Sequence, residues 1–199
     1  MMKKLFVSMA VLCLGFTQTT LADEVRVGVS VHDAKVFDDL IVTGRHGKEQ
    51  SLSVIGDYIF ETPGWLEWAW QARPFVGGSL NLGGKTSFVD AGLLWRKSLS
   101  DNIYGEVAFG LAVHDGAVRT PDPLLATTPA EVLERQRRKN TEIEFGSRVL
   151  FRTGFTIGYA LNEKWAGEFV FEHLSHGQIL GGPENEGSNE LGVRVARRF

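Results

Sequence analysis

The chain has 199 residues, of which 43% are hydrophobic, and its 21 basic and 24 acidic side chains give a formal net charge of -3. This charge balance excludes a strongly basic nucleic-acid-binding protein, and 23 Gly with 6 Pro is not the composition of a disordered chain. Only the first segment is continuously apolar, which excludes a bundle of membrane helices but not a membrane β-barrel, whose strands are apolar only at every second residue.

Residues 1–22 have the pattern of a secretory signal peptide. Lys3 and Lys4 are the basic start, residues 5–16 form the apolar stretch, and residues 20–22 offer a cleavage site. This apolar stretch is short for a membrane anchor. We therefore expect a leader at 1–22.

The remainder, residues 23–199, is expected to form a single domain. The only cysteine, Cys13, lies in the expected leader, so the domain has no disulfide. Lipoprotein attachment at Cys13 is an alternative, disfavoured because Leu12 is larger than the small residue that processing prefers.

Period-two alternation of apolar and polar residues recurs along this domain, as in 25–32, and is typical of half-buried strands. The other predicted strands are 50–60, 66–82, 86–98, 102–114, 143–161, 165–176 and 188–199. Eight strands are a common number for a small membrane barrel, so the predicted fold class is all-β, an eight-stranded antiparallel transmembrane β-barrel.

The connections alternate in length, as they do in barrels of the bacterial outer membrane, where the short turns are periplasmic. The expected short turns are 61–64, 98–102 and 162–164. The expected outer loops are 33–49, 83–85, 115–142 and 177–187, of which 83–85 is unusually tight. The chain ends on Phe199 after apolar residues at two-residue steps, a common ending of such barrels, although Arg197 interrupts the series. A soluble lipocalin-like barrel is the alternative fold.

Within the third outer loop, Thr128 and Pro129 predict a helix start, with a helical period over 129–139. The basic run 135–139 is interpreted as the solvated end of this helix. A sharper hypothesis is that it contacts lipopolysaccharide phosphates.

The predicted strand 165–176 carries polar residues on both faces. Phe169 and Phe171 predict which face meets lipid, and His173 and Ser175 share that face. A histidine beside a serine can act as base to a nucleophilic hydroxyl, as in ester hydrolysis. The alternative is a polar pair at headgroup depth with no chemical role.

The segments 173–177 and 183–189 resemble the active-site region of the lipid A 3-O-deacylases (the PagL family), and 24–29 resembles the family's first strand. The resemblance implies an outer-membrane esterase that acts on lipid A in lipopolysaccharide and needs no cofactor. Carried over by residue, Ser175 is the nucleophile and His173 the base. Asn185 and Gly177 lie where the family stabilises the oxyanion.

Two positions depart from the family pattern. The residue after Ser175 is His176 instead of Asn, and the acid that orients the base falls on Asn189. Glu190 is one residue late and points into the barrel, so it could replace Asn189 only through a bulge. We therefore expect Asn189 to orient His173, as in Cys-His-Asn proteases, with reduced activity.

The remaining charged residues of the last two strands are expected to pair inside the barrel. They are Glu168, Glu172, Glu190, Arg194 and Arg198.

The five histidines show no spacing typical of metal ligands, so no metal site is predicted. The absence of an acid at position 189 also supports a different class of function, a non-catalytic barrel for adhesion, surface binding or membrane integrity. The sequence leaves the oligomeric state open, with a homodimer as one alternative.

Overall fold

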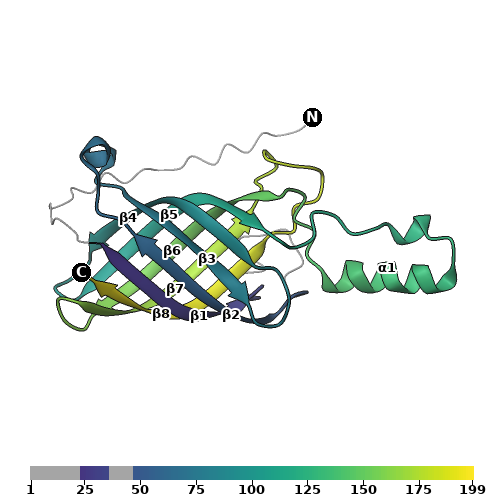
Figure 1. The fold of residues 1–199 in the computed structure, drawn as a ribbon, viewed down its shortest axis with the longest axis horizontal. Coiled ribbons are helices and arrows are strands. Elements are labelled where there is room, and N and C mark those ends of the chain that lie inside the picture. The colour runs from purple at the N-terminus through teal and green to yellow at the C-terminus, as the bar shows by residue number, and fades with distance from the viewer. Residues whose placement is uncertain (1–22, 36–46) are drawn as a thin grey trace, which may run out of the picture.

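The computed structural model describes residues 23–35 and 47–199, so the expected leader at 1–22 lies outside the described residues. Eight strands, each antiparallel to its neighbours, close into a barrel (Figure 1) because β1 pairs with both β2 and β8. The strands are β1 Glu24–His32, β2 Ser51–Ile59, β3 Arg73–Asn81, β4 Phe88–Ser98, β5 Ile103–His114, β6 Val149–Ala160, β7 Trp165–Ser175 and β8 Ser188–Arg198. The predicted fold class is confirmed.

The two ends of the barrel differ. We call the end with connections 33–50, 82–87, 115–148 and 176–187 the loop end, and the end with connections 60–72, 99–102 and 161–164 the turn end. The ends of the described chain meet at the turn end, where the Phe199 amide donates to the Asp23 carbonyl at 3.0 Å. The loop end also carries an arm with helix α1, Pro129–Thr141, which extends away from the barrel (Figure 1).

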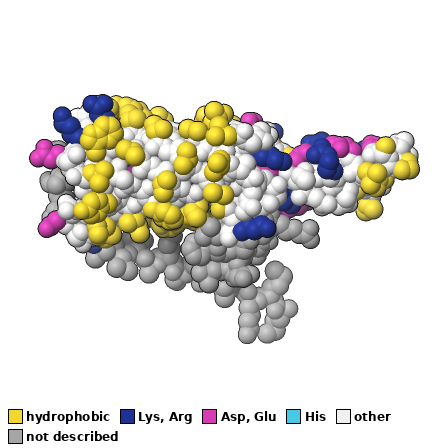
Figure 2. Space-filling model, turned by 90° about the horizontal axis from the view of Figure 1, so that it is seen from below, with side chains coloured by type: hydrophobic (Ala, Val, Ile, Leu, Met, Phe, Trp, Pro, Cys, Tyr) yellow, Lys and Arg dark blue, Asp and Glu magenta, His cyan; other side chains and the backbone are white. Residues whose placement is uncertain are grey.

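The outer wall of the barrel is apolar. Outward side chains such as Val27, Phe109, Ile157 and Val193 are each about half exposed or more. Figure 2 shows hydrophobic side chains spread along the barrel and charged side chains gathered towards its ends. Exposed apolar surface of this extent is what a hydrocarbon environment requires. In the described part of the chain, no helix is long and apolar enough to cross a membrane.

The interior is filled by ion pairs. Arg26 binds Glu106 through two bonds of 2.7 and 2.8 Å, and Arg194 donates to Glu168 and to Asp57 at 2.5 Å each. The cavity among these side chains is only about 10 Å³, room for about one water molecule, so the barrel has no channel here. The pairing predicted for the interior is confirmed, and its partners come from more strands than the last two.

The expected bounds of two strands are wrong. Residues 64–69, which were expected to be the turn and start of strand 66–82, form a 3-10 helix, η1 Gly64–Ala69. Residues 143–148 precede β6 and pack at the loop end, where Ile143 and Phe145 are buried against Leu150 and Leu174. Both segments are apolar enough to resemble strands, but each packs some of its apolar side chains against the barrel without joining its sheet.

Candidate active site

His173 and Asn189 face each other across β7 and β8 on the outer wall near the loop end. Their Nδ1 and Oδ1 atoms are 2.8 Å apart. Asn189 is buried, and its Nδ2 donates to the Ala34 carbonyl at 3.4 Å. Because the amide nitrogen is directed at Ala34, the amide oxygen accepts from Nδ1–H of His173, which leaves Nε2 as the basic nitrogen.

Ser175 is the last residue of β7 and lies on the same face as His173. It is half-buried and pairs in register with Phe151 of β6. Gly187, with φ of +67°, approaches both residues: a Cβ there would lie 3.3 Å from His173 Cε1 and 3.6 Å from Ser175 Cβ. Glycine thus lets the backbone pass directly over the pair.

The loop 176–187 folds back towards Ser175. The His176 amide, next to Ser175 in the chain, donates to Asn185 Oδ1 at 3.0 Å, and His176 Nε2 donates to the Glu184 carbonyl. His176 is fully buried, so its contacts with Glu184 and Asn185 hold this loop against the barrel. Gly177 follows with φ of +61° and is exposed. The two residues expected at the oxyanion thus lie in the loop that begins at the serine.

Glu190 has different partners. It faces into the barrel, where it binds Ser30 and His32. The β7–β8 register runs without a bulge from Trp165–Arg197 to Leu174–Ser188, so Glu190 stays on the inner face. Of the two residues considered from the sequence, Asn189 is the one that contacts His173.

A polar network joins the loops above this site, and the sequence did not point to it. The Glu49 carboxylate accepts from the Thr86 hydroxyl at 2.7 Å, from the Ile143 amide at 3.0 Å and from His32 at 3.3 Å. Burial by itself raises the pKa of Glu49, but these hydrogen bonds lower that pKa to about 2. One carboxylate therefore holds three separate segments together.

A second contact of this network reaches the candidate active-site loop. Lys48 Nζ binds both carboxylate oxygens of Glu186 at 2.6 Å, and Glu186 also accepts from the Glu144 amide at 2.8 Å. Glu186 lies between Asn185 and Gly187, so this contact holds the loop over Ser175. Lys48, Glu49 and Glu186 occur in loops without a recognisable spacing, which is why their contacts could not be predicted.

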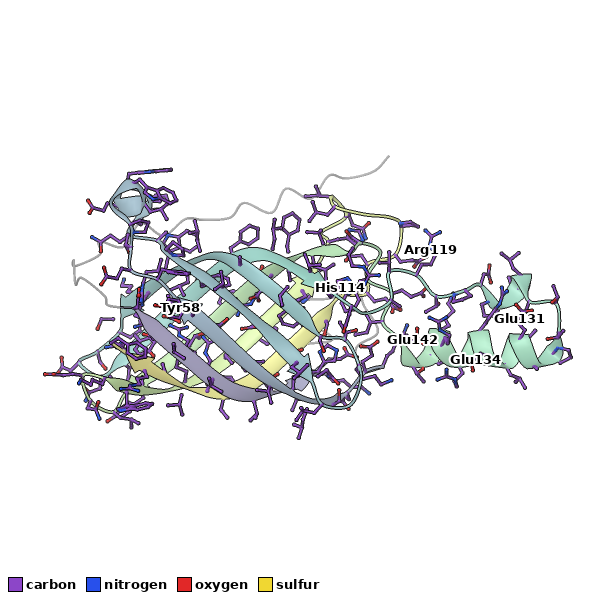
Figure 3. The ribbon with its side chains drawn as sticks, in the orientation of Figure 1. Tyr58, His114, Arg119, Glu131, Glu134 and Glu142 are labelled. Carbon is purple, nitrogen blue, oxygen red and sulfur yellow. The ribbon has the colours of Figure 1, made fainter. Side chains whose placement is uncertain are left out.

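The arm contains the helix that the sequence predicts over 129–139, observed as α1 Pro129–Thr141. The Thr128 hydroxyl caps α1 by accepting from the Glu131 amide. Three of its arginines pair with acids of the arm: Arg135 with Glu131, Arg137 with Glu134, and Arg138 with Glu142. Figure 3 marks these three glutamates along the arm. This pairing favours the interpretation of the basic run as a solvated helix end over a phosphate-binding surface.

The histidines are dispersed. His32 is enclosed by Glu190 and Glu49, and His114, labelled in Figure 3, donates to the Ser147 carbonyl at 2.7 Å. His46 lies outside the described residues. Among the residues that the structure describes, no group of three or more His, Cys, Asp or Glu side chains is placed to hold a metal ion.

The closed barrel, its apolar wall and the two short turns at one end define the class of outer-membrane β-barrels. Residues 56–198 match the family model of lipid A 3-O-deacylase (PagL), and the chain belongs to this family. No curated protein sequence matches the chain.

Solved structures agree with this class. The chain is similar to the crystal structure of the outer membrane enzyme PagL, with a TM-score of 0.51 and 11% identity over 88% of this chain and 99% of that one. It is also similar to Neisserial surface protein A (TM-score 0.52, 10% identity, 92% and 100% covered). A third match is the N-terminal β-barrel domain of Pseudomonas aeruginosa OprF (TM-score 0.51, 8% identity, 91% and 100% covered). At these identities the similarity shows the fold.

Proposed function

We propose that this protein is an outer-membrane esterase that hydrolyses the 3-O-linked acyl chain of lipid A in lipopolysaccharide. The observation that carries the proposal is the 2.8 Å contact between His173 and Asn189 on the outer wall, two residues from Ser175. Family membership supplies the substrate class. The loop end would face the cell exterior, so that the site meets lipid A in the outer leaflet.

The chemistry needs only these side chains and water. His173 Nε2 takes the proton of Ser175 Oγ as Oγ attacks the ester carbonyl carbon, and the tetrahedral intermediate collapses to an acyl-serine. The sugar oxygen leaves with the proton from His173. A water molecule, deprotonated by the same nitrogen, then releases the fatty acid and restores Ser175.

Asn189 has the role of an orienting residue. Its amide, directed by Ala34, keeps the proton of His173 on Nδ1, so Nε2 can accept a proton from Ser175. A neutral amide stabilises the imidazolium of the transition state less than a carboxylate does. The proposal therefore includes a lower turnover than that of a variant with an acid at this position.

The oxyanion would be stabilised by the loop 176–187. Asn185 uses its oxygen to accept from His176, which leaves its NH₂ group as a donor. The exposed Gly177 amide is the second candidate donor. Charge that develops on the ester oxygen is stabilised most by donors that are already held in place.

A non-catalytic barrel is the second candidate function. The amide at Asn189 favours it, because a carboxylate at this position would stabilise the charged imidazole. In this case the polar pair on the wall would be a structural feature of the membrane interface.

Mass spectrometry of lipid A separates the two candidates. Cells that produce the protein should lose one hydroxyacyl chain from lipid A, and cells that produce Ser175→Ala should not. Ser79→Ala, a buried serine inside the barrel, is the matched control and should act like the unchanged protein. Identical lipid A with the unchanged protein and with Ser175→Ala, at equal amounts of folded barrel, would refute the esterase.

A further inference from the structure

The connection between β2 and β3 is unusual for the turn end. The other two connections there, 99–102 and 161–164, are short turns, whereas residues 60–72 include η1. Joining two antiparallel strands takes only a few residues. The connection therefore has more residues than the link between β2 and β3 requires.

η1 lies against the outside of the barrel. Its buried residues Leu66 and Ala69 pack on Leu93 and Trp95, which belong to the outward face of β4. Trp95 Nε1 also donates to the Ala69 carbonyl at 3.0 Å. Figure 1 shows the short coil of η1, in blue, outside the sheet at the end where the C-terminus lies.

The other side of η1, together with its C-cap residue Trp70, presents three tryptophans. Trp65, Trp68 and Trp70 are 70%, 81% and 57% exposed. Trp70 adopts a left-handed backbone with φ of 54°, a conformation that is unfavourable for a bulky residue. The fold thus holds three of its largest apolar side chains outward, one of them at a conformational cost, and a purely aqueous setting would not favour this exposure.

The five tryptophans of the chain share one end of the molecule. Trp95 lies near the turn end of β4 and Trp165 begins β7, so both belong to the same end as the two tryptophans of η1 and Trp70. Trp is enriched where membrane and water meet, because its ring is apolar while its N–H needs a polar partner. η1 is moreover continuous with the apolar wall through Leu93 and Trp95.

We propose that η1 is an interfacial anchor, whose tryptophans insert into the phospholipid leaflet at the turn end of the barrel. The partner is lipid at the level where headgroups meet acyl chains, which accommodates the single charged residue of η1, Glu67, on the water side. The strands β2 to β4 lie across the barrel from β7, so an anchor on this wall fixes the tilt and depth of the barrel from the side opposite Ser175.

Site-directed spin labelling tests the depth of η1. The full barrel is refolded into phospholipid vesicles with Cys13→Ser and a single label at Trp68→Cys, leaving Trp65 and Trp70 in place. Two matched labels serve as references: Val107→Cys on the middle of the apolar wall, and Glu163→Cys in the exposed turn 161–164 at the same end. Oxygen, which partitions into lipid, and a water-soluble nickel chelate compete for each label.

We expect the Trp68 label to be relaxed more by oxygen than by the nickel chelate, at a depth between those of the two references. Nickel accessibility equal to that of the Glu163 label would place η1 in water and overturn the proposal. Protection from both reagents would mean that protein covers η1, a second copy included, and would overturn it as well.

The unchanged protein gives an independent measurement. Bromine atoms carried high on the acyl chains should quench its tryptophan fluorescence more than bromine near the chain ends. Quenching mainly by an aqueous quencher would contradict the anchor. Neither measurement depends on esterase activity, so failure of the anchor and failure of the proposed function are distinguishable.

Discussion

The two faces of β7 carry polar residues of different kinds. Inside the barrel, Glu168 accepts from Arg194 at 2.5 Å and Glu172 is paired with Arg152, so each carboxylate is enclosed with a cation. On the outer wall, His173 and Ser175 are only half-buried, and Asn189, which contacts His173, is a neutral amide. One strand thus separates charges that are paired inside the barrel from polar groups that are half-exposed on its outer wall.

The largest effect on the outer face is expected for His173→Gln. Glutamine can still donate to Asn189 but cannot act as a base at neutral pH. We expect kcat for acyl release to fall by about 10³- to 10⁴-fold, or about 4–5.5 kcal/mol, with the thermal unfolding midpoint unchanged. The measurement is fatty-acid release from purified lipopolysaccharide.

His114→Gln is the matched control, since His114 lies at the same end of the barrel on β5 and outside the site. Its folded fraction should keep normal activity. If both variants lost activity equally, His173 would have no special role.

The inner face is tested by Arg194→Met. This change leaves Glu168 and Asp57 buried with one cation fewer, which we expect to lower the free energy of unfolding by about 3–5 kcal/mol. Activity per folded molecule should be unchanged. The measurement is denaturant unfolding in lipid vesicles.

Arg197→Met on the opposite face of the same strand is the control. Arg197 is exposed and lies over the rings of Trp165 and Phe199, so its loss should cost less than about 1 kcal/mol. Equal destabilisation by the two substitutions would contradict the division between the faces.

A smaller effect is expected for Asn189→Asp, which changes the orienting amide into a carboxylate of nearly the same shape. A carboxylate stabilises the imidazolium that forms in the transition state, so kcat should rise about tenfold. Asn189→Leu should lower kcat, because it removes the acceptor. A kcat that does not differ among the three proteins would show that residue 189 does not orient His173.

The smallest effect at neutral pH is expected for the titration of Glu49, which joins the loops at the loop end. Its pKa of about 2, below the usual 4.5, means that it stabilises the loop network fully above pH 4.5 and loses this contribution as the pH falls through about 2. The NMR shift of the Ile143 amide proton, which is donated to Glu49, should follow this titration. A titration midpoint near pH 4.5, or the same titration in Glu49→Gln, would contradict the lowered pKa of Glu49.

Much of the barrel was predictable because a strand repeats every two residues. The alternation at 25–32 and in the other segments located all eight strands, and Thr128 with Pro129 located the helix of the arm. Residues 66–72 and 143–148 were assigned wrongly because short apolar segments suit a strand as well as a segment packed against a wall.

The sequence by itself determined the barrel, the face of β7 on which His173 and Ser175 lie, and the family resemblance in the last segments. Local periodicity and spacing are sufficient for these. Tertiary structure decided that Asn189 contacts His173 while Glu190 contacts His32, because this depends on the register of β7 against β8. It also decided the contacts of Glu49 and the position of η1, since both join segments that are distant in the chain and meet only when the barrel closes.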